Sequence, residues 1–376
     1  MLSMIEDSVR SARSPAQRLR SLGTLLLAAS MLTSQAASAC TSFLIPTSDN
    51  GAVYGRTMEF GFELESRAMM IPRNYKLASS GADGKPAASW TSKYAAVGLN
   101  ALGVTALVDG MNEKGLVGGI LYFPGFAGYA DAGKSDPAKS LAPWDVLTWA
   151  LTNFATIAEV KAALEGMAVI GVEQQQMKMV PPVHYTLHDA SGASLVIEPI
   201  DGKLKLYDNP LGVMTNSPPF DWHLNNIRNY VKMSPVAADP LKIGGKTFEP
   251  FGQGSGLLGI PGDPTPPSRF IRALGYAASA KQQPDGPQTV RLVEHIMNNF
   301  DIPIGFINSA AKGGELEYTQ WTSVADLRAR KYYIKGYRDQ VLRMVDLSSF
   351  DLDAKGLRVA PFKVSLTPPP LEFAKP

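Results

Sequence analysis

The sequence of 376 residues has few of the groups that several protein classes need. Its single cysteine, Cys40, cannot form an internal disulfide. This cysteine and the four histidines of the chain are too few soft ligands for a cysteine-rich zinc site. The 36 basic and 34 acidic residues nearly cancel, so no strong field directs the chain to nucleic acid. What remains is a composition of 45% hydrophobic and 19% charged residues, which is typical of a folded globular protein.

The first forty residues have the pattern of a secretory signal peptide. Residues 22–32 (LGTLLLAASML) form an apolar run of the expected length, which is shorter than the roughly 20 residues that span a bilayer. Small residues occupy positions −3 and −1 before Cys40, as in an A-x-A cleavage site. We therefore predict a signal peptide over 1–39 and a single domain over 40–376, exported to the bacterial periplasm or secreted, with no stable membrane insertion after cleavage. The basic region of the signal consists of four arginines, Arg10, Arg13, Arg18 and Arg20.

Cleavage places Cys40 at the new N-terminus, and three interpretations compete there. A cysteine after a bacterial signal can carry a lipid anchor, although such sites usually have leucine at −3, where this chain has Ala37. Cys40 can also be only the first residue of a strand. The third interpretation is an N-terminal nucleophile whose own α-amine, with an ordinary pKa of about 7.7–8.0, serves as general base. The signal alone leaves all three open.

The segment after Cys40 predicts a β-hairpin, because an Asn-Gly dipeptide lies in the turn at 48–51. A turn centred near Asn50 places residues 59–61 opposite Cys40 and brings Arg56 and Glu59 near the thiol. Strict alternation puts these two side chains on opposite faces, so both can face the site only through a bulge or at a strand end. The two strands of this hairpin are expected over 41–47 and 52–60.

The rest of the chain shows hairpin patterns interleaved with helical ones. No Ser/Gly-rich linker or internal repeat divides it, so we predict one layered α+β domain. Strands are expected over 104–109, 116–123, 184–188, 194–200, 203–208 and within 317–346, and helices over 143–167 with a break near 152–156, 221–233, 267–280 and 289–300.

A glycine-rich motif, Gly254-x-Gly256-x-x-Gly259, has the spacing of a dinucleotide-binding turn. That turn must open a helix, and the prolines Pro261 and Pro264 that follow it prevent one here. We interpret the motif as a loop and predict no cofactor.

The histidines support two weaker alternatives. His184 and His188 can share one face of a strand, but two histidines without a third ligand are weak support for a metal, and we predict none. A Cys–His pair between Cys40 and His223 or His295 stays open, because such partners are distant in sequence.

Several segments, in order along the chain, together resemble the choloylglycine hydrolase and penicillin V acylase family. The resemblance runs from residue 40 to roughly 350, which is nearly all of the predicted mature chain. The segments that carry it are Cys40, Gly55–Arg56–Thr57–Met58–Glu59–Phe60, Asp109–Gly110–Met111–Asn112–Glu113–Lys114–Gly115–Leu116, Thr215–Asn216–Ser217–Pro218, Phe220–Asp221–Trp222–His223, Gly252–Gln253–Gly254–Ser255–Gly256, Pro261–Gly262–Asp263, Ser268–Arg269–Phe270 and Thr319–Gln320–Trp321–Thr322–Ser323.

This resemblance implies an N-terminal-nucleophile hydrolase with an αββα four-layer sandwich of two antiparallel sheets. It implies that Cys40 is the nucleophile and that Arg56 and Arg269 lie near it. Asn216 matches an oxyanion-hole asparagine. Glu59 falls where the family usually has an aspartate that orients the α-amine, so the carboxylate is kept with one more methylene.

The resemblance also implies a substrate class. Tyr122 falls where penicillin V acylases commonly have tyrosine and bile salt hydrolases asparagine, and Phe60 is expected to add to an apolar pocket. We expect a hydrolase of linear carboxamides similar to penicillin V acylase, with a small-molecule substrate and a homotetrameric assembly. The alternatives are a conjugated bile acid hydrolase, an N-acyl homoserine lactone acylase, and a non-catalytic envelope lipoprotein lipidated on Cys40.

Overall fold

The computed structural model describes residues 39–308, 316–361, 365–367, 370–371 and 373. These residues belong to one compact unit, Ala37–Pro376. The predicted signal peptide lies, apart from its last residue, outside the described residues. Within the described part of the chain, no helix combines the length and the apolar composition that crossing a membrane requires.

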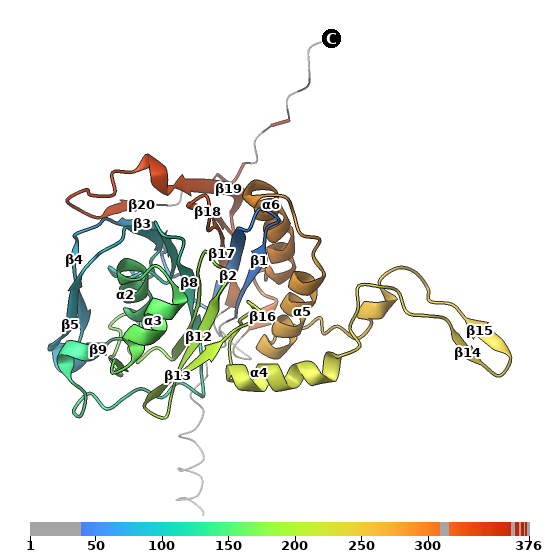
Figure 1. Cartoon of the computed structure of the whole chain (residues 1–376), viewed down its shortest axis with the longest axis horizontal. Coiled ribbons are helices and arrows are strands. Elements are labelled where there is room, and N and C mark those ends of the chain that lie inside the picture. The colour runs from blue at the N-terminus through green and yellow to red at the C-terminus, as the bar shows by residue number, and fades with distance from the viewer. Residues whose placement is uncertain (1–38, 309–315, 362–364, 368–369, 372, 374–376) are drawn as a thin grey trace, which may run out of the picture. The chain divides into compact units, whose positions relative to one another are not determined.

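Two antiparallel sheets form the centre of this unit (Figure 1). The first sheet has the order β1 (Cys40–Pro46), β2 (Ala52–Phe60), β17 (Leu316–Asp326), β18 (Lys331–Gly336) and β19 (Asp339–Asp346), with β16 (Ile307–Asn308) paired to β17. The second has the order β13 (Lys203–Asp208), β12 (Ser194–Ile200), β11 (Val183–His188), β8 (Val117–Tyr122), β7 (Asp109–Asn112), β6 (Ala96–Leu99), β3 (Ala68–Ile71) and β20 (Arg358–Ala360).

Helices cover the outer face of each sheet, so the layers run helix, sheet, sheet, helix (Figure 1). On the first sheet, α5 (Pro266–Ser279) packs against β1, and α6 (Gly286–Met297) packs against β2 and β17. On the second, α2 (Val146–Asn153) packs against β7 and β8, with α3 (Ile157–Leu164) beside it. The short α4 (Phe220–Asn226) contacts α5. The predicted four-layer sandwich is confirmed.

Strand β2 is buried along its whole length because it is covered on both faces. On the helix side, Gly55 lets α6 approach closely: a Cβ there would lie 2.4 Å from Cγ1 of Val293. On the other side, Tyr54, Arg56 and Met58 point between the two sheets, where the site lies. Strand β2 is therefore a fully buried strand that places a charged side chain, Arg56, between the two sheets, where a reaction could take place.

Smaller elements complete the described chain. The sequence patterns did not predict most of them, but the turns at 227–230 and 298–300 lie within the helices predicted over 221–233 and 289–300. Three two-stranded pairs are β4 (Lys76–Ser80) with β5 (Pro86–Thr91), β9 (Ser140–Leu141) with β10 (Ala168–Val169), and β14 (Leu241–Ile243) with β15 (Lys246–Phe248). Single 3-10 turns are η2 (Ala82–Gly84), η3 (Pro137–Lys139), η4 (Ile227–Tyr230), η5 (Ser255–Leu257), η6 (Asn298–Phe300) and η7 (Leu347–Ser349).

The predicted register of the first hairpin is wrong. The loop has five residues, so Pro46 pairs with Ala52 and Cys40 lies opposite Met58, not opposite residues 59–61. Asn50 does take the left-handed conformation that the Asn-Gly signal predicts, with φ of 62°. The loop is closed by the Thr47 N–H, which donates to the Gly51 carbonyl at 2.9 Å. It spans residues 47–51 and is one residue longer than the predicted turn at 48–51.

The predicted strand over 104–109 is also wrong, because most of that segment connects β6 to β7. Leu99 pairs with Asp109, and Gly103 turns the chain with φ of 69°. The turn between β7 and β8 is stabilised by the Asn112 side-chain oxygen, which accepts from the N–H groups of Lys114 and Leu116. In contrast, the predicted break in the 143–167 helix is confirmed, since α2 and α3 are separated by residues 154–156.

Candidate active site

Cys40 is the first residue of β1 and is almost fully buried, with 1% of its surface exposed. Its Sγ lies 3.8 Å from Sδ of Met58, its partner on β2. Its backbone N–H donates to Oδ1 of Asn216 at 2.7 Å. The preceding carbonyl, of Ala39, accepts from the Glu59 N–H at 3.0 Å, so the bond between residues 39 and 40 lies inside the site.

Arg56 projects from β2 between the sheets and reaches the thiol. Its Nη2 donates to Cys40 Sγ at 3.6 Å and to the carbonyl of Ile120, and its Nη1 donates to the Val108 carbonyl at 2.6 Å. Nη1 also lies 3.4 Å from Oδ2 of Asp109, and neither side chain of this pair is exposed. Burial lowers the pKa of Arg56, but the interactions with Cys40 and Asp109 outweigh it and raise the pKa above its ordinary value.

Asp109, on β7 of the second sheet, accepts hydrogen bonds from strands of the first sheet. Its Oδ2 accepts from the Tyr54 hydroxyl at 2.9 Å, and its Oδ1 accepts from the Ser323 hydroxyl at 2.7 Å and from the Tyr332 hydroxyl. This junction packs over Gly119 on β8, where a Cβ would lie 2.6 Å from Nη1 of Arg56. The carboxylate therefore fixes the guanidinium that faces the thiol.

Asn216 and Arg269 approach Cys40 from the other side. Arg269, on α5, donates through Nη1 to the Cys40 carbonyl and through Nη2 to Asn216 Oδ1 at 2.7 Å. Two donors on Oδ1 fix the orientation of the Asn216 amide, and its Nδ2 donates to the Tyr122 carbonyl at 2.8 Å. Asn216 thus links the backbone of the cysteine to β8.

Glu59 lies on the opposite face of β2 from Arg56, as strict alternation predicts. Its Oε1 accepts from the Thr319 hydroxyl at 2.7 Å, at the point where the pairing of β17 with β2 shifts by one residue. Burial raises the pKa of Glu59 to about 8, although the charge of Arg269 and the hydrogen bond from Thr319 act to lower it. The register shift lies in β17, between Thr319 and Trp321, so β2 has no bulge that would turn Glu59 to the face of Arg56.

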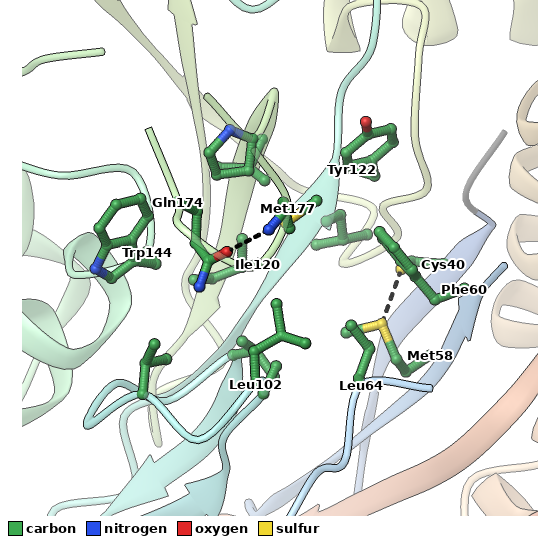
Figure 2. A pocket seen from close by; sticks show the side chains of 16 residues that line it. Cys40, Met58, Phe60, Leu64, Leu102, Ile120, Tyr122, Trp144, Gln174 and Met177 are labelled. Atoms are coloured by element: carbon green, nitrogen blue, oxygen red, sulfur yellow. Dashed lines mark hydrogen bonds between the residues drawn. The ribbon is translucent and has the colours of Figure 1, made fainter. Parts of the chain in front are cut away.

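An apolar cavity of about 90 Å³ opens beside the thiol (Figure 2). Phe60 and Tyr122, both predicted as pocket residues, line it with their rings edge to face at 5.8 Å between centroids. Among the described residues, no charged side chain lines this cavity. An acyl group can occupy it, whereas a charged group would lose its hydration without gaining a partner.

The histidines do not serve the thiol. His223 stacks on Phe270 and its Nε2 lies 2.9 Å from the Asn216 carbonyl, and burial lowers its pKa to about 4. His295 is exposed on α6. The structure therefore does not form the Cys–His pair that the sequence left open.

The two strand histidines each have protein partners. His184 contacts Glu198 and the Thr215 carbonyl, and His188 contacts hydroxyls of Thr186 and Ser194. Among the described residues, no group of three or more His, Cys, Asp or Glu side chains could hold a metal ion.

Sequence reasoning assigned no role to Asp109, Met58 or Gly119, although the first two lie in segments that carry the family resemblance. The signal for Asp109 was an acidic residue directly after the apolar pair Leu107–Val108, in a segment expected to be a strand. Its partner could not be named without the register between the sheets.

A buried thiol at the head of a strand, between a guanidinium and a carboxamide and open to an apolar cavity, is the arrangement of a cysteine amidohydrolase. A family model described as linear amide C-N hydrolases, choloylglycine hydrolase family, matches residues 40–360. The chain belongs to this family, and it is an amidohydrolase of linear amides.

Characterised relatives cover most of the chain. It is 32% identical to the bile salt hydrolase/transferase of Clostridium perfringens over 335 residues, which is 87% of this chain and 98% of that protein. It is 28% identical to the penicillin V acylase of Pectobacterium atrosepticum over 357 residues, 88% of this chain and 87% of that protein. A crystal structure of a variant of the conjugated bile acid hydrolase from C. perfringens superimposes with a TM-score of 0.78 at 29% identity, covering 89% of this chain and 100% of that one.

Proposed function

We propose that the mature chain cleaves linear carboxamides with Cys40 as an N-terminal nucleophile and has a specificity similar to that of penicillin V acylase. The observation that carries this proposal is the position of Cys40. Its thiol borders an apolar cavity and lies 3.6 Å from a buried guanidinium, while its backbone nitrogen is held by Asn216 at 2.7 Å. Nucleophile, base and anion-stabilising groups would then lie within one site.

The first step transfers the thiol proton of Cys40 to its own α-amine. The thiolate attacks the carbonyl carbon of the substrate and forms a tetrahedral intermediate. The ammonium group then protonates the leaving amine as the C–N bond breaks, which leaves a thioester on Cys40. Water, deprotonated by the same amine, hydrolyses the thioester and frees the acid. Arg56 stabilises the negative charge on sulfur in the thiolate, before its attack and again when the thioester is hydrolysed.

The neighbouring groups have separate proposed roles. The Asn216 amide nitrogen carries two hydrogens: Tyr122 accepts one, and the other donates to the oxyanion together with a backbone N–H near Tyr122. Arg269 holds Asn216 and the Cys40 carbonyl in place. Glu59 orients the α-amine of Cys40. Its backbone lies on that side of the cysteine, since the Glu59 N–H donates to the carbonyl of Ala39, the residue before Cys40.

Activity in this mechanism requires removal of residues 1–39. While Ala39 is attached, the nitrogen of Cys40 is an amide and cannot accept a proton. A signal peptidase that cuts after Ala39 would release the exported protein, in the periplasm or beyond, and create its base in the same step. The competing role, an envelope lipoprotein lipidated on Cys40, predicts a mature mass increased by acyl chains.

The test compares amine release from phenoxymethylpenicillin and glycocholate by the processed protein. We expect faster release from the penicillin, because Tyr122 and Phe60 narrow the cavity beside Cys40. Faster release from glycocholate would reassign the substrate to conjugated bile acids, and hydrolysis of N-acyl homoserine lactones alone would assign it to that class. Absence of hydrolysis with an acylated N-terminus would support the lipoprotein.

The proposed homotetramer has support in an arm formed by residues 231–262, which includes β14 and β15 (Figure 1). An exposed apolar surface of this extent is unusual for a protein that stays monomeric. Light scattering should give the mass of a tetramer, and serine substitutions at Phe248 and Phe251 should lower it. A monomeric wild type would refute this assembly. The exposed apolar side chains of the arm are Val231, Val236, Leu241, Ile243, Phe248, Phe251 and Leu258.

A further inference from the structure

A second cavity, of about 430 Å³, lies beside the apolar one and shares three lining residues with it, Val104, Trp144 and Gln174. Figure 2 shows Trp144 and Cys40 at opposite sides of the first cavity, with Gln174 on the Trp144 side. The second cavity therefore lies beyond the end of the first that is far from the thiol. The shared residues form a common wall between the two.

This wall is formed by three separate segments, and Val104 lies in the first of them, between β6 and β7. Trp144 precedes α2, and Gln174 lies in the connection between β10 and β11. Gln174 is 6% exposed, its Oε1 accepts from the Met177 N–H at 2.8 Å, and its own N–H donates to the Met179 carbonyl at 2.9 Å. These contacts fix Gln174 in the shared wall beside Trp144.

The two cavities differ in chemistry. The first is lined almost wholly by apolar side chains, whereas the second adds the polar side chains of Ser80, Thr105, Asp145, Glu173 and Gln176. None of the described residues that line the second cavity is basic. A carboxylate at the end of a ligand would meet Asp145 and Glu173 there, while a hydroxyl would find acceptors and donors.

We propose that the second cavity binds the distal end of a long acyl chain, and that it accepts a neutral end, plain or hydroxylated, and rejects a carboxylate. This inference rests on the proposed function, since the carbonyl of that chain is the one that Cys40 attacks. The apolar cavity holds the methylenes next to the carbonyl. Trp144 marks the point at which the chain enters the polar cavity.

The test measures kcat/KM for N-acyl glycines with unbranched chains from butanoyl to tetradecanoyl. The wild type should show rising kcat/KM with length, by about fourfold for each methylene that leaves water. Ala78→Phe places a ring in the second cavity from β4. It should lower kcat/KM for dodecanoyl glycine by about tenfold and leave hexanoyl glycine within about twofold. Thr105→Phe, from another exposed wall position, should do the same if Ala78→Phe does not fold.

Lys76→Phe is the matched control, because Lys76 is exposed on the same strand and lines neither cavity. It should leave kcat/KM unchanged for both hexanoyl and dodecanoyl glycine. The ω-hydroxy and ω-carboxy forms of dodecanoyl glycine provide a second readout, and the carboxylate should be the poorer substrate.

A wild-type profile that falls steadily beyond hexanoyl, or equal losses for both chain lengths in both filling variants, would overturn the second site. Equal kcat/KM for the two ω-substituted substrates would overturn its charge selectivity. Absence of hydrolysis of every amide by the wild type would instead refute the proposed function.

Discussion

Removing the carboxylate charge of Asp109 should destabilise the protein strongly, because Asp109 is the buried counter-ion of Arg56. Neither side chain is exposed, and Nη1 of Arg56 lies 3.4 Å from Oδ2. In Asp109→Asn the amide is nearly the same size but carries no charge. It also has N–H groups where the carboxylate accepted from Tyr54, Ser323 and Tyr332.

The magnitude follows from burial. Breaking a buried ion pair by removing one partner costs about 3–5 kcal/mol, because the other charge is left without compensation. An exposed pair is worth about 0–1 kcal/mol, and Lys161 with Asp208 is such a pair at 2.8 Å. Asp109→Asn should therefore lower the free energy of unfolding by several kcal/mol more than Asp208→Asn does.

Guanidinium unfolding followed by tryptophan fluorescence and circular dichroism measures both variants. A third variant, Arg56→Met combined with Asp109→Asn, removes both charges and should be more stable than Asp109→Asn alone. If the double variant is instead less stable than Asp109→Asn, the reasoning that Asp109 compensates a buried charge is wrong. Equal midpoints for Asp109→Asn and Asp208→Asn would refute it as well.

Four further changes test the site. Cys40→Ala should abolish amine release and leave the fold unchanged; full activity would exclude covalent catalysis by this residue. Asn216→Ala should raise the barrier by about 2.7–4 kcal/mol, seen as a loss in kcat, and an unchanged kcat would remove it from the oxyanion site. Between the ordinary pKa of Glu59, 4.5, and its raised value of about 8, the unfolded chain releases a proton that the folded chain keeps. The free energy of unfolding of the wild type should thus fall with rising pH in this range, by at most about 1.4 kcal/mol per pH unit. Glu59→Gln should lack this slope. Parallel curves of stability against pH for the two proteins would contradict the raised pKa of Glu59. Gly119→Ala should be strongly destabilising because its Cβ would lie 2.6 Å from Arg56 Nη1, whereas Gly252→Ala, with nothing within 4 Å, should be neutral; similar melting temperatures would contradict this.

The local parts of the fold could be predicted because short-range chemistry decides them. The left-handed Asn50 needs only its own turn, and the break after α2 needs only a few neighbouring residues. The register of β1 on β2 could not be predicted, because one extra residue in the loop changes every pair. The exposed hairpin of β14 and β15 has no alternation of buried and exposed residues from which to infer it.

The site followed the same division. Cys40 stood out because a cleavage pattern precedes it, and Arg56 because the hairpin brings it back. Asn216 and Arg269 entered only through the family resemblance, since their contacts with Cys40 span 176 and 229 residues of sequence. Asp109 lay in a motif of that family, but its role depends on the packing of two sheets.

A chain with one sulfhydryl has no resolving cysteine to reverse its oxidation. Cys40, the free cysteine described above, has no second cysteine that could trap a sulfenic acid as a disulfide. Recovery after a first oxidation therefore depends on a small thiol from outside that can reach a buried sulfur. Because Cys40 is the single cysteine of the chain, titration with an alkylating reagent, at one equivalent per chain, measures the fraction of molecules whose nucleophile is intact.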